Sequence, residues 1–395
     1  MKTNKVSVLV SGAAIMLMLG ILYVWGVFNA PIMKLFEWDK SQSSMVFSAM
    51  IVSFVAGIVF GGKIQNTVGP KKVVLGGGLM FAFGFLLSSF VPTEISWLLY
   101  LSYGLISGLG VGATYTAIIS TAQRWYPNKK GLATGISVGA FGFSNVIFAP
   151  IIRKMLETMS VQVVFRIFSV VFLIVILLAF SFINNPESSG DKSTNLYGDP
   201  PSKMLKSKNF YILALTLGFA TMLFFFINPL LMILAVEKGI DVETAVIGVM
   251  ITGIANASGR LLVPIYSDFV GYRKTIVSLL VITALGAISM IFVQGILFFG
   301  VAFLVALAFG GYSAIYPVAT VSNFGPKYLS TNYGFVMIGF GLSALSTPYI
   351  GRAFQKVKET GGLDLTNYFI FITAICILAI FMILMLKENK KEVKK

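Results

Sequence analysis

Twelve apolar segments, each long enough to cross a lipid bilayer as a helix, follow one another along the chain. A hydrocarbon core about 30 Å thick requires about 20 apolar residues at 1.5 Å of rise per residue. The backbone polar groups of such segments must be satisfied internally, and an α-helix does this within a single segment. The approximate cores are 7–32, 44–62, 73–91, 97–121, 132–152, 162–184, 209–236, 244–266, 275–294, 296–321, 332–352 and 366–386. We therefore predict an all-α membrane protein with twelve transmembrane helices.

The composition excludes several other classes of protein. With 57% hydrophobic and 11% charged residues, the chain is too apolar for a soluble fold of 395 residues. Histidine is absent and Cys376 is the one cysteine, so we expect neither a metal site nor an internal disulfide. The net charge of +15 comes from Lys and Arg between the apolar segments, which indicates a membrane surface rather than nucleic acid as the partner. The sequence contains no nucleotide-binding loop and no nucleophile–base arrangement, so we expect no enzyme, no nucleotide and no cofactor.

The charges of the loops predict the orientation of the chain. With both termini in the cytoplasm, twenty of the 30 Lys and Arg face the cytoplasm and eight face the outside. The remaining two, Arg166 and Arg260, lie within apolar segments. Cytoplasmic loops carry the excess of Lys and Arg in multi-pass proteins. We therefore expect a multi-pass protein of the plasma (inner) membrane with cytoplasmic N- and C-termini.

The chain also consists of two related halves. Residues 185–208 are polar and rich in Ser, Pro and Gly, which is typical of a linker, and they separate a bundle at 1–184 from a bundle at 209–395. The stretch 62–69 recurs 202 positions later as 264–271, and each copy is followed by a basic pair. Parallel repeats with a substrate site where the halves meet are a transporter architecture. We therefore predict two six-helix bundles related by pseudo-symmetry.

One basic residue lies deep within an apolar segment. Arg260 is eight residues before Asp268, the next charge, so its backbone lies ~12 Å from the nearer membrane surface. A cation at this depth normally faces a polar cavity on a substrate or ion path. Asn256 lies one helical turn earlier, so the two side chains can present an amide and a guanidinium to one ligand. The alternative is a structural arginine that binds carbonyls of neighbouring helices.

The loops 62–71 and 264–273 resemble the signature loops of the major facilitator superfamily. The resemblance covers the whole chain and implies the major facilitator fold, in which these loops gate the cytoplasmic side. The first loop departs from the motif, because Asn66 and Pro70 stand where an acid and a base are usual. In the second loop, the resemblance implies that Asp268 caps a helix or pairs with basic neighbours when that side is closed. The gating residues implied are Gly62, Asn66, Gly69, Asp268, Gly271 and Arg273.

Three further features resemble the oxalate/formate antiporter family and its relatives, the monocarboxylate transporters. They are the stretch 23–28, the stretch 124–135 and the arginine of the eighth segment. In the eleventh segment, the oxalate exchanger of this family has a lysine where the alignment places Phe340, so the second cation for a dicarboxylate is missing. The substrate-binding residues implied by the resemblance are Arg260, Asn256, Tyr115, Tyr312, Tyr316 and Phe340.

The charged residues favour a small organic anion as the substrate. A guanidinium offers a planar carboxylate two parallel hydrogen bonds. All Asp and Glu lie in predicted loops or termini, so the membrane interior offers no carboxylate as a proton relay. Together with the family resemblance, which implies a carboxylate, these charges lead us to predict a monomeric transporter for a monocarboxylate of the lactate, pyruvate or formate type, working by alternating access with exchange or uniport. The alternatives left open are an oxalate/formate-type dicarboxylate antiporter, a proton-coupled monocarboxylate symporter, a multidrug exporter and a non-transporting nutrient sensor.

Overall fold

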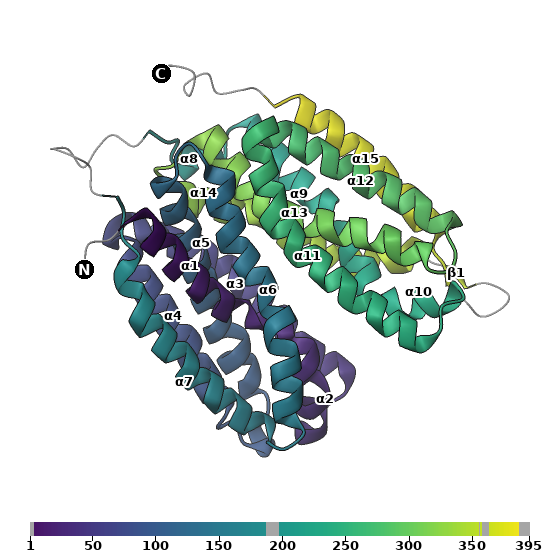
Figure 1. The fold of residues 1–395 in the computed structure, drawn as a ribbon, viewed down its shortest axis with the longest axis horizontal. Coiled ribbons are helices and arrows are strands. Elements are labelled where there is room, and N and C mark those ends of the chain that lie inside the picture. The colour runs from purple at the N-terminus through teal and green to yellow at the C-terminus, as the bar shows by residue number, and fades with distance from the viewer. Residues whose placement is uncertain (1–3, 187–196, 355, 358–362, 387–395) are drawn as a thin grey trace. The chain divides into compact units, whose positions relative to one another are not determined.

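The computed structural model describes residues 4–186, 197–354, 356–357 and 363–386, and nearly all of them are helical (Figure 1). Both termini and the middle of the predicted linker at 185–208, residues 187–196, lie outside the described residues. The described chain forms two compact units. The first contains Met1–Pro201 together with Phe324–Phe335, and the second contains Ser202–Asn323 together with Val336–Lys395.

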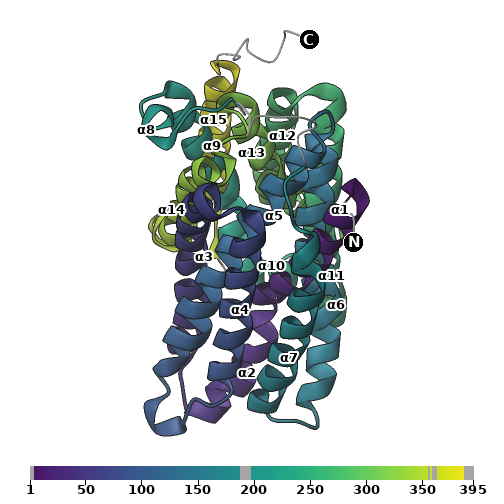
Figure 2. The same cartoon turned by 90° about the vertical axis from the view of Figure 1, so that its left-hand side faces the viewer.

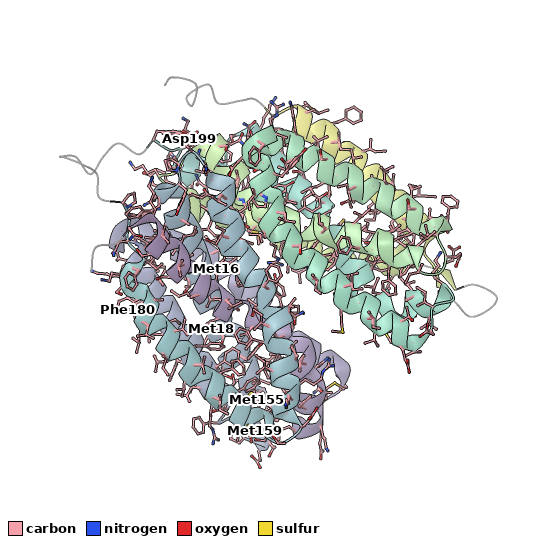
Figure 3. All side chains as sticks on the ribbon, in the orientation of Figure 1. Met16, Met18, Met155, Met159, Phe180 and Asp199 are labelled. Atoms are coloured by element: carbon pink, nitrogen blue, oxygen red, sulfur yellow. The ribbon has the colours of Figure 1, made fainter. Side chains whose placement is uncertain are left out.

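The first unit contains six long helical segments, some of them interrupted. In chain order its elements are α1 (Lys5–Leu19), η1 (Gly20–Val24), α2 (Trp25–Phe36), α3 (Lys40–Val68), α4 (Pro70–Ser88), η2 (Thr93–Ile95), η3 (Tyr100–Ser107), α5 (Gly108–Trp125), α6 (Lys130–Leu156), α7 (Val161–Ala179) and η4 (Phe180–Phe182). Figure 2 shows α3, α4 and α7 running side by side. Asp199 lies at the opposite end of this unit from Met155 and Met159 (Figure 3). The unit therefore has two ends, each made of connections that the sequence assigns to one side of the membrane.

The second unit is built in the same way. Its elements are α9 (Lys208–Ile227), η5 (Asn228–Leu230), α10 (Leu231–Glu237), α11 (Val242–Val270), α12 (Tyr272–Phe292), α13 (Leu297–Phe324), α14 (Leu329–Phe354), the two-residue strands β1 (Lys356–Val357) and β2 (Leu363–Asp364), and α15 (Thr366–Leu384). The short helix α8 (Pro201–Met204) begins at the last residue of the first unit. Helix α14 begins in the first unit and continues in the second after Phe335.

Eleven helical segments within the described residues are long and apolar enough to cross a membrane. The predicted segment 332–352 falls in α14, whose 26 residues have sufficient length, but α14 is not among these eleven. Its first turns carry the polar residues Ser330, Thr331 and Asn332, all of them buried. The segments expose apolar side chains on their outer faces, for example Leu178 at 70%. The all-α membrane fold is therefore as predicted.

Two glycines give the repeated loops the same backbone. Gly69 separates α3 from α4 with φ 84° and ψ 165°, and Gly271 separates α11 from α12 with φ 86° and ψ 147°. Each glycine N–H also donates to the carbonyl four residues earlier, at 3.0 Å to Gln65 O and 2.8 Å to Ser267 O. A positive φ is strained for every residue with a Cβ. The repeat seen in the sequence is therefore a repeat of backbone geometry.

Side-chain caps fix where long helices begin. The Asp39 carboxylate accepts from the Gln42 N–H at 2.8 Å at the start of α3, and Gln42 Oε1 accepts from the Asp39 N–H at 3.0 Å. At the start of α11, the Asp241 carboxylate accepts from the Thr244 N–H at 2.9 Å. That hydrogen bond lowers the pKa of Asp241, so the cap is ionised at neutral pH. Such caps satisfy N–H groups that have no partner within the helix.

Candidate functional site

Glycines at two positions bring α11 and α13 into backbone contact around the predicted site. A Cβ on Gly259 would overlap Leu307 O of α13. A Cβ on Gly310 would overlap the backbone oxygen of Asn256 and would lie 3.0 Å from Asn256 Oδ1. The two helices therefore pack at a distance that only glycine permits. This close packing fixes the position of the helix turn that carries Asn256 and Arg260.

Arg260 is buried within the second unit, at 3% exposure. Among the described residues it is the one charged side chain that is fully buried. Its Nε donates to Asn256 Oδ1 at 3.1 Å, across one turn of α11. The amide carries no charge, so it orients the plane of the guanidinium without neutralising it. A buried cation held in this way is suited to bind an anion through its planar fork.

Phenylalanines from three helices form a cluster in the same unit. Phe224 of α9 stacks on Phe309 of α13 with ring centroids 4.0 Å apart. Phe340 of α14 lies 5.0 Å from Phe225 and 6.1 Å from Phe309, again between centroids. Phe309 directly precedes Gly310, so the backbone of α13 connects this cluster with the Asn256 contact. Phe340 is 3% exposed, and the structure places it in an apolar environment.

The two predicted tyrosines of α13 are engaged by threonines of their own unit. The Tyr312 hydroxyl lies 2.9 Å from Thr283 Oγ1 of α12. The Tyr316 hydroxyl donates to Thr216 Oγ1 of α9 at 2.9 Å. Both tyrosines are fully buried. Their described contacts therefore tie α13 to α12 and α9, and a role in substrate binding stays a prediction.

Tyr115, the sixth predicted residue, belongs to the first unit. It lies on α5 at 2% exposure, and its ring packs edge-on against Phe54 at 5.3 Å and Phe141 at 5.0 Å. The structure thus gathers five of the predicted residues in the second unit and places one in the first. Three helices, α3, α5 and α6, meet at the Tyr115 ring.

The first repeated loop contacts the beginning of α14 inside the first unit. A Cβ on Gly62 would lie 2.5 Å from Ser330 C and Thr331 N, and Asn66 Nδ2 donates to Thr331 Oγ1 at 3.4 Å. Between them, the buried Gln65 donates to Ser120 Oγ at 2.8 Å and accepts from Ser330 Oγ at 2.6 Å. We did not predict a role for Gln65. The amide of Gln65, about one helical turn after Gly62, was the one signal in the sequence, and its partners lie 55 and 265 positions away.

The second repeated loop makes different contacts. Asp268 is exposed on the last turn of α11, and Gly271 carries the positive φ. Arg273 Nη2 donates at 2.8 Å to the carbonyl oxygen of Leu384, the last residue of α15. A cation at the C-terminal end of a helix stabilises its unpaired carbonyls. The two loops therefore have the same backbone conformation, but in the second loop the basic residue caps a neighbouring helix.

Arg124 holds the connection between α13 and α14, and sequence reasoning did not assign it a role. Its Nη2 donates to Pro326 O at 3.4 Å and to Lys327 O at 3.3 Å, and its Nη1 donates to Asn185 Oδ1 at 3.0 Å. The next residue, Trp125, donates from Nε1 to Asn184 O at 2.7 Å. The stretch 124–135 thus fixes the start of the linker within the first unit. These contacts join residues far apart in the chain, so no local pattern indicates them.

Comparisons with known proteins agree with this architecture. The sequence model described as Major Facilitator Superfamily matches residues 10–348. The oxalate:formate antiporter of Oxalobacter formigenes is 27% identical over 349 residues, which cover 84% of this chain and 80% of the antiporter. Monocarboxylate transporter 13 of Rattus norvegicus is 33% identical over 141 residues, which cover 36% of this chain and 32% of that protein. The crystal structure of the transporter FucP in the outward conformation matches with a TM-score of 0.69 at 15% identity, covering 95% of this chain and 97% of FucP.

Proposed function

Because the chain belongs to the Major Facilitator Superfamily, we propose that it carries a small organic anion across the membrane, and that the anion is a monocarboxylate of the lactate, pyruvate or formate type. The fold is that of solved transporters of this superfamily, and the chain is a multi-pass membrane transporter rather than an enzyme. The named relatives include an oxalate:formate antiporter and a monocarboxylate transporter. They support a carboxylate as the class of substrate.

The observation that carries the proposal is the buried guanidinium of Arg260 with its Nε on Asn256. A buried charge is costly unless an opposite charge and hydrogen bonds compensate it. A carboxylate provides both, because its two oxygens match the geometry of the guanidinium fork.

The surroundings favour a monoanion over a dianion. Phe340 stands where the family resemblance expects a lysine in an oxalate exchanger, and it packs within the phenylalanine cluster. Among the described residues, Arg260 has no second fully buried cation beside it in the unit. One carboxylate pairs one guanidinium, whereas a second carboxylate would be desolvated without a partner. An apolar wall then suits a short alkyl or keto group.

Exchange or uniport is the coupling that the buried residues support. No Asp or Glu is buried among the described residues, so the interior provides no carboxylate that could carry a proton with the substrate. The excess of Lys and Arg in the predicted cytoplasmic loops supports a plasma-membrane protein with both termini in the cytoplasm. The proposal also includes that the protein works as a monomer and transports by alternating access.

The test is substrate binding and exchange by Arg260 variants in proteoliposomes. Arg260→Lys keeps the charge and loses the fork, whereas Arg260→Gln loses both, so affinity for labelled formate or lactate should fall in that order. Loss of a desolvated charge pair costs at least ~2 kcal/mol, which corresponds to about a 30-fold weaker affinity.

Arg166 offers a matched control within another apolar segment. Its Nε donates to Ser89 Oγ at 3.3 Å, and its guanidinium lies over the Phe90 ring at 4.6 Å. Arg166→Gln should leave affinity unchanged. An Arg260→Gln protein that binds and exchanges like the wild type would remove Arg260 from the site.

A further inference from the structure

The first span is interrupted by a tighter helical segment. The 3-10 segment η1 joins α1 to α2, and Gly20 within it packs so closely on α6 that a Cβ would overlap Phe141 O and lie 2.5 Å from Ser144 Cβ. Trp25 is the first residue of α2 and is 4% exposed. A stretch of 3-10 helix within a longer helix often marks a hinge or local strain.

The fourth span begins with a wider helical segment. The π-helix η3 covers Tyr100–Ser107, and Tyr103 in its middle is completely buried. Ser107 Oγ donates to Ser102 O at 3.2 Å, and Ser88 Oγ of α4 donates to Ser102 Oγ at 2.9 Å. Segments of π-helix are rare and occur frequently at functional sites. This one contains a chain of buried hydroxyls in the interior of the first unit.

The two irregular segments meet at Trp25 and Tyr103. Their ring centroids are 4.7 Å apart, and Phe85 and Phe165 lie 5.1 Å and 5.8 Å from the Tyr103 ring. Neither the Trp25 Nε1–H nor the Tyr103 hydroxyl has a hydrogen-bond partner among the described residues. A buried donor without a partner costs about 1–3 kcal/mol, and a membrane interior offers no bulk water. Two such donors on touching rings therefore point to a ligand.

We propose that Trp25 and Tyr103 together bind a buried water molecule inside the first unit, where the 3-10 segment of the first span meets the π segment of the fourth. An ion does not fit, because the neighbouring rings are apolar and supply no compensating charge. A buried water needs two to four polar partners. The Trp25 Nε1–H and the Tyr103 hydroxyl provide two.

The site joins two segments whose backbones depart from the α-helix. A water can exchange one carbonyl partner for another at little cost, whereas a direct side-chain hydrogen bond cannot. The water therefore allows the ladder of η1 or η3 to shift without leaving polar groups unpaired. This makes the contact between Trp25 and Tyr103 a hydrated hinge within the unit, separate from the anion site at Arg260.

The sign of a stability change tests the proposal. Tyr103→Phe removes the hydroxyl and keeps the ring. If the hydroxyl had no hydrogen-bond partner, its removal would leave the melting temperature unchanged or raise it. Removal of a hydroxyl that holds a water should instead lower it, by about 2 °C or more. Tyr368→Phe provides the benchmark, because that hydroxyl donates to Met222 O at 3.1 Å and its loss should also lower the melting temperature. A Tyr103→Phe protein as stable as the wild type, or more stable, overturns the proposal.

A double-mutant cycle tests whether the two donors share one ligand. Trp25→Phe removes the indole N–H but also reduces the ring, so its own effect is not diagnostic. In the Trp25→Phe background, Tyr103→Phe should lower the melting temperature by less than it does in the wild type, because the shared water is already lost. Fully additive effects would overturn the shared site. Density for a water within hydrogen-bond distance of both donors in an experimental map of the protein would support it, and clear density for the two rings with none between them would contradict it.

Discussion

The hydrogen bond between Asn256 and Arg260 makes binding sensitive to charge at position 256. In the wild type, the amide Oδ1 accepts from Arg260 Nε at 3.1 Å and adds no charge. Asn256→Ala removes the acceptor. Asn256→Asp keeps an acceptor of nearly the same shape and adds a negative charge beside the guanidinium. The two variants therefore separate the orienting hydrogen bond from the charge that the substrate would meet.

The two changes have different expected magnitudes. A hydrogen bond to a charged group contributes about 1.5–3 kcal/mol. Because Asn256 orients the guanidinium and leaves its charge in place, we expect Asn256→Ala to cost the lower end of this range in substrate affinity, which is roughly tenfold. A carboxylate about 4 Å from the guanidinium interacts with it by ~4 kcal/mol at an effective dielectric constant of about 20. A substrate carboxylate must compete with that interaction, and we expect a net loss of at least ~2 kcal/mol, or about 30-fold. Affinity should thus fall from wild type to Ala to Asp.

Equilibrium binding of labelled formate or lactate to the purified variants measures this order, with melting temperatures as the control for folding. The opposite order, with Asp equal to the wild type or better than Ala, would refute the reasoning. It would show that position 256 needs only an acceptor. Arg260 would then be a structural cation held by neighbouring acceptors, and the substrate would bind elsewhere.

Three further expectations concern the loops, the coupling and the selectivity. Gly69→Ala and Gly271→Ala should each cost about 1 kcal/mol of stability, because both positions have positive φ with nothing within 4 Å of the added Cβ. Gly253→Ala, which is equally uncrowded but within regular helix, is the control and should keep or raise the melting temperature. Homoexchange should vary little between about pH 6 and 8, because no Asp or Glu is buried among the described residues and the sequence contains no histidine, and accumulation driven by a proton gradient would contradict this. Phe340→Lys should raise the preference for oxalate over formate in competition experiments, because a dianion pairs both cations, and an unchanged preference would remove Phe340 from the site.

The sequence predicted the features that depend on local periodicity. The spacing of Asn256 and Arg260 placed both on one face of a helix, and the structure joins them by a hydrogen bond. The repeat of 62–69 at 264–271 placed Gly69 and Gly271 at equivalent positions, and in the structure both glycines have a positive φ. In each case the interacting residues lie within about one helical turn of one another, so the spacing in the sequence is sufficient to predict the interaction.

The features that were missed depend on residues distant in the chain. The contacts of Arg124 involve residues about 60 and 200 positions away, and the buried amide of Gln65 pairs with Ser120 and Ser330. The division of α14 after Phe335 between two units was not predicted either, because the segment reads as one helix. Periodicity indicates which face of a helix is buried, but it does not indicate which partner covers that face.

The backbone contact at Gly259 and Gly310 limits how this transporter can change its substrate. No side chain can be added at either position without moving α13 away from the turn that carries Arg260. The rings of Phe225 and Phe340 have no such restriction, because a smaller or more polar side chain there leaves the helix spacing intact. Laboratory selection for growth on a new carboxylate should therefore accumulate substitutions among the phenylalanines and leave the glycine pair unchanged. If Arg260 binds the substrate as proposed, the shape of the substrate can therefore change more easily than the charge that the site recognises.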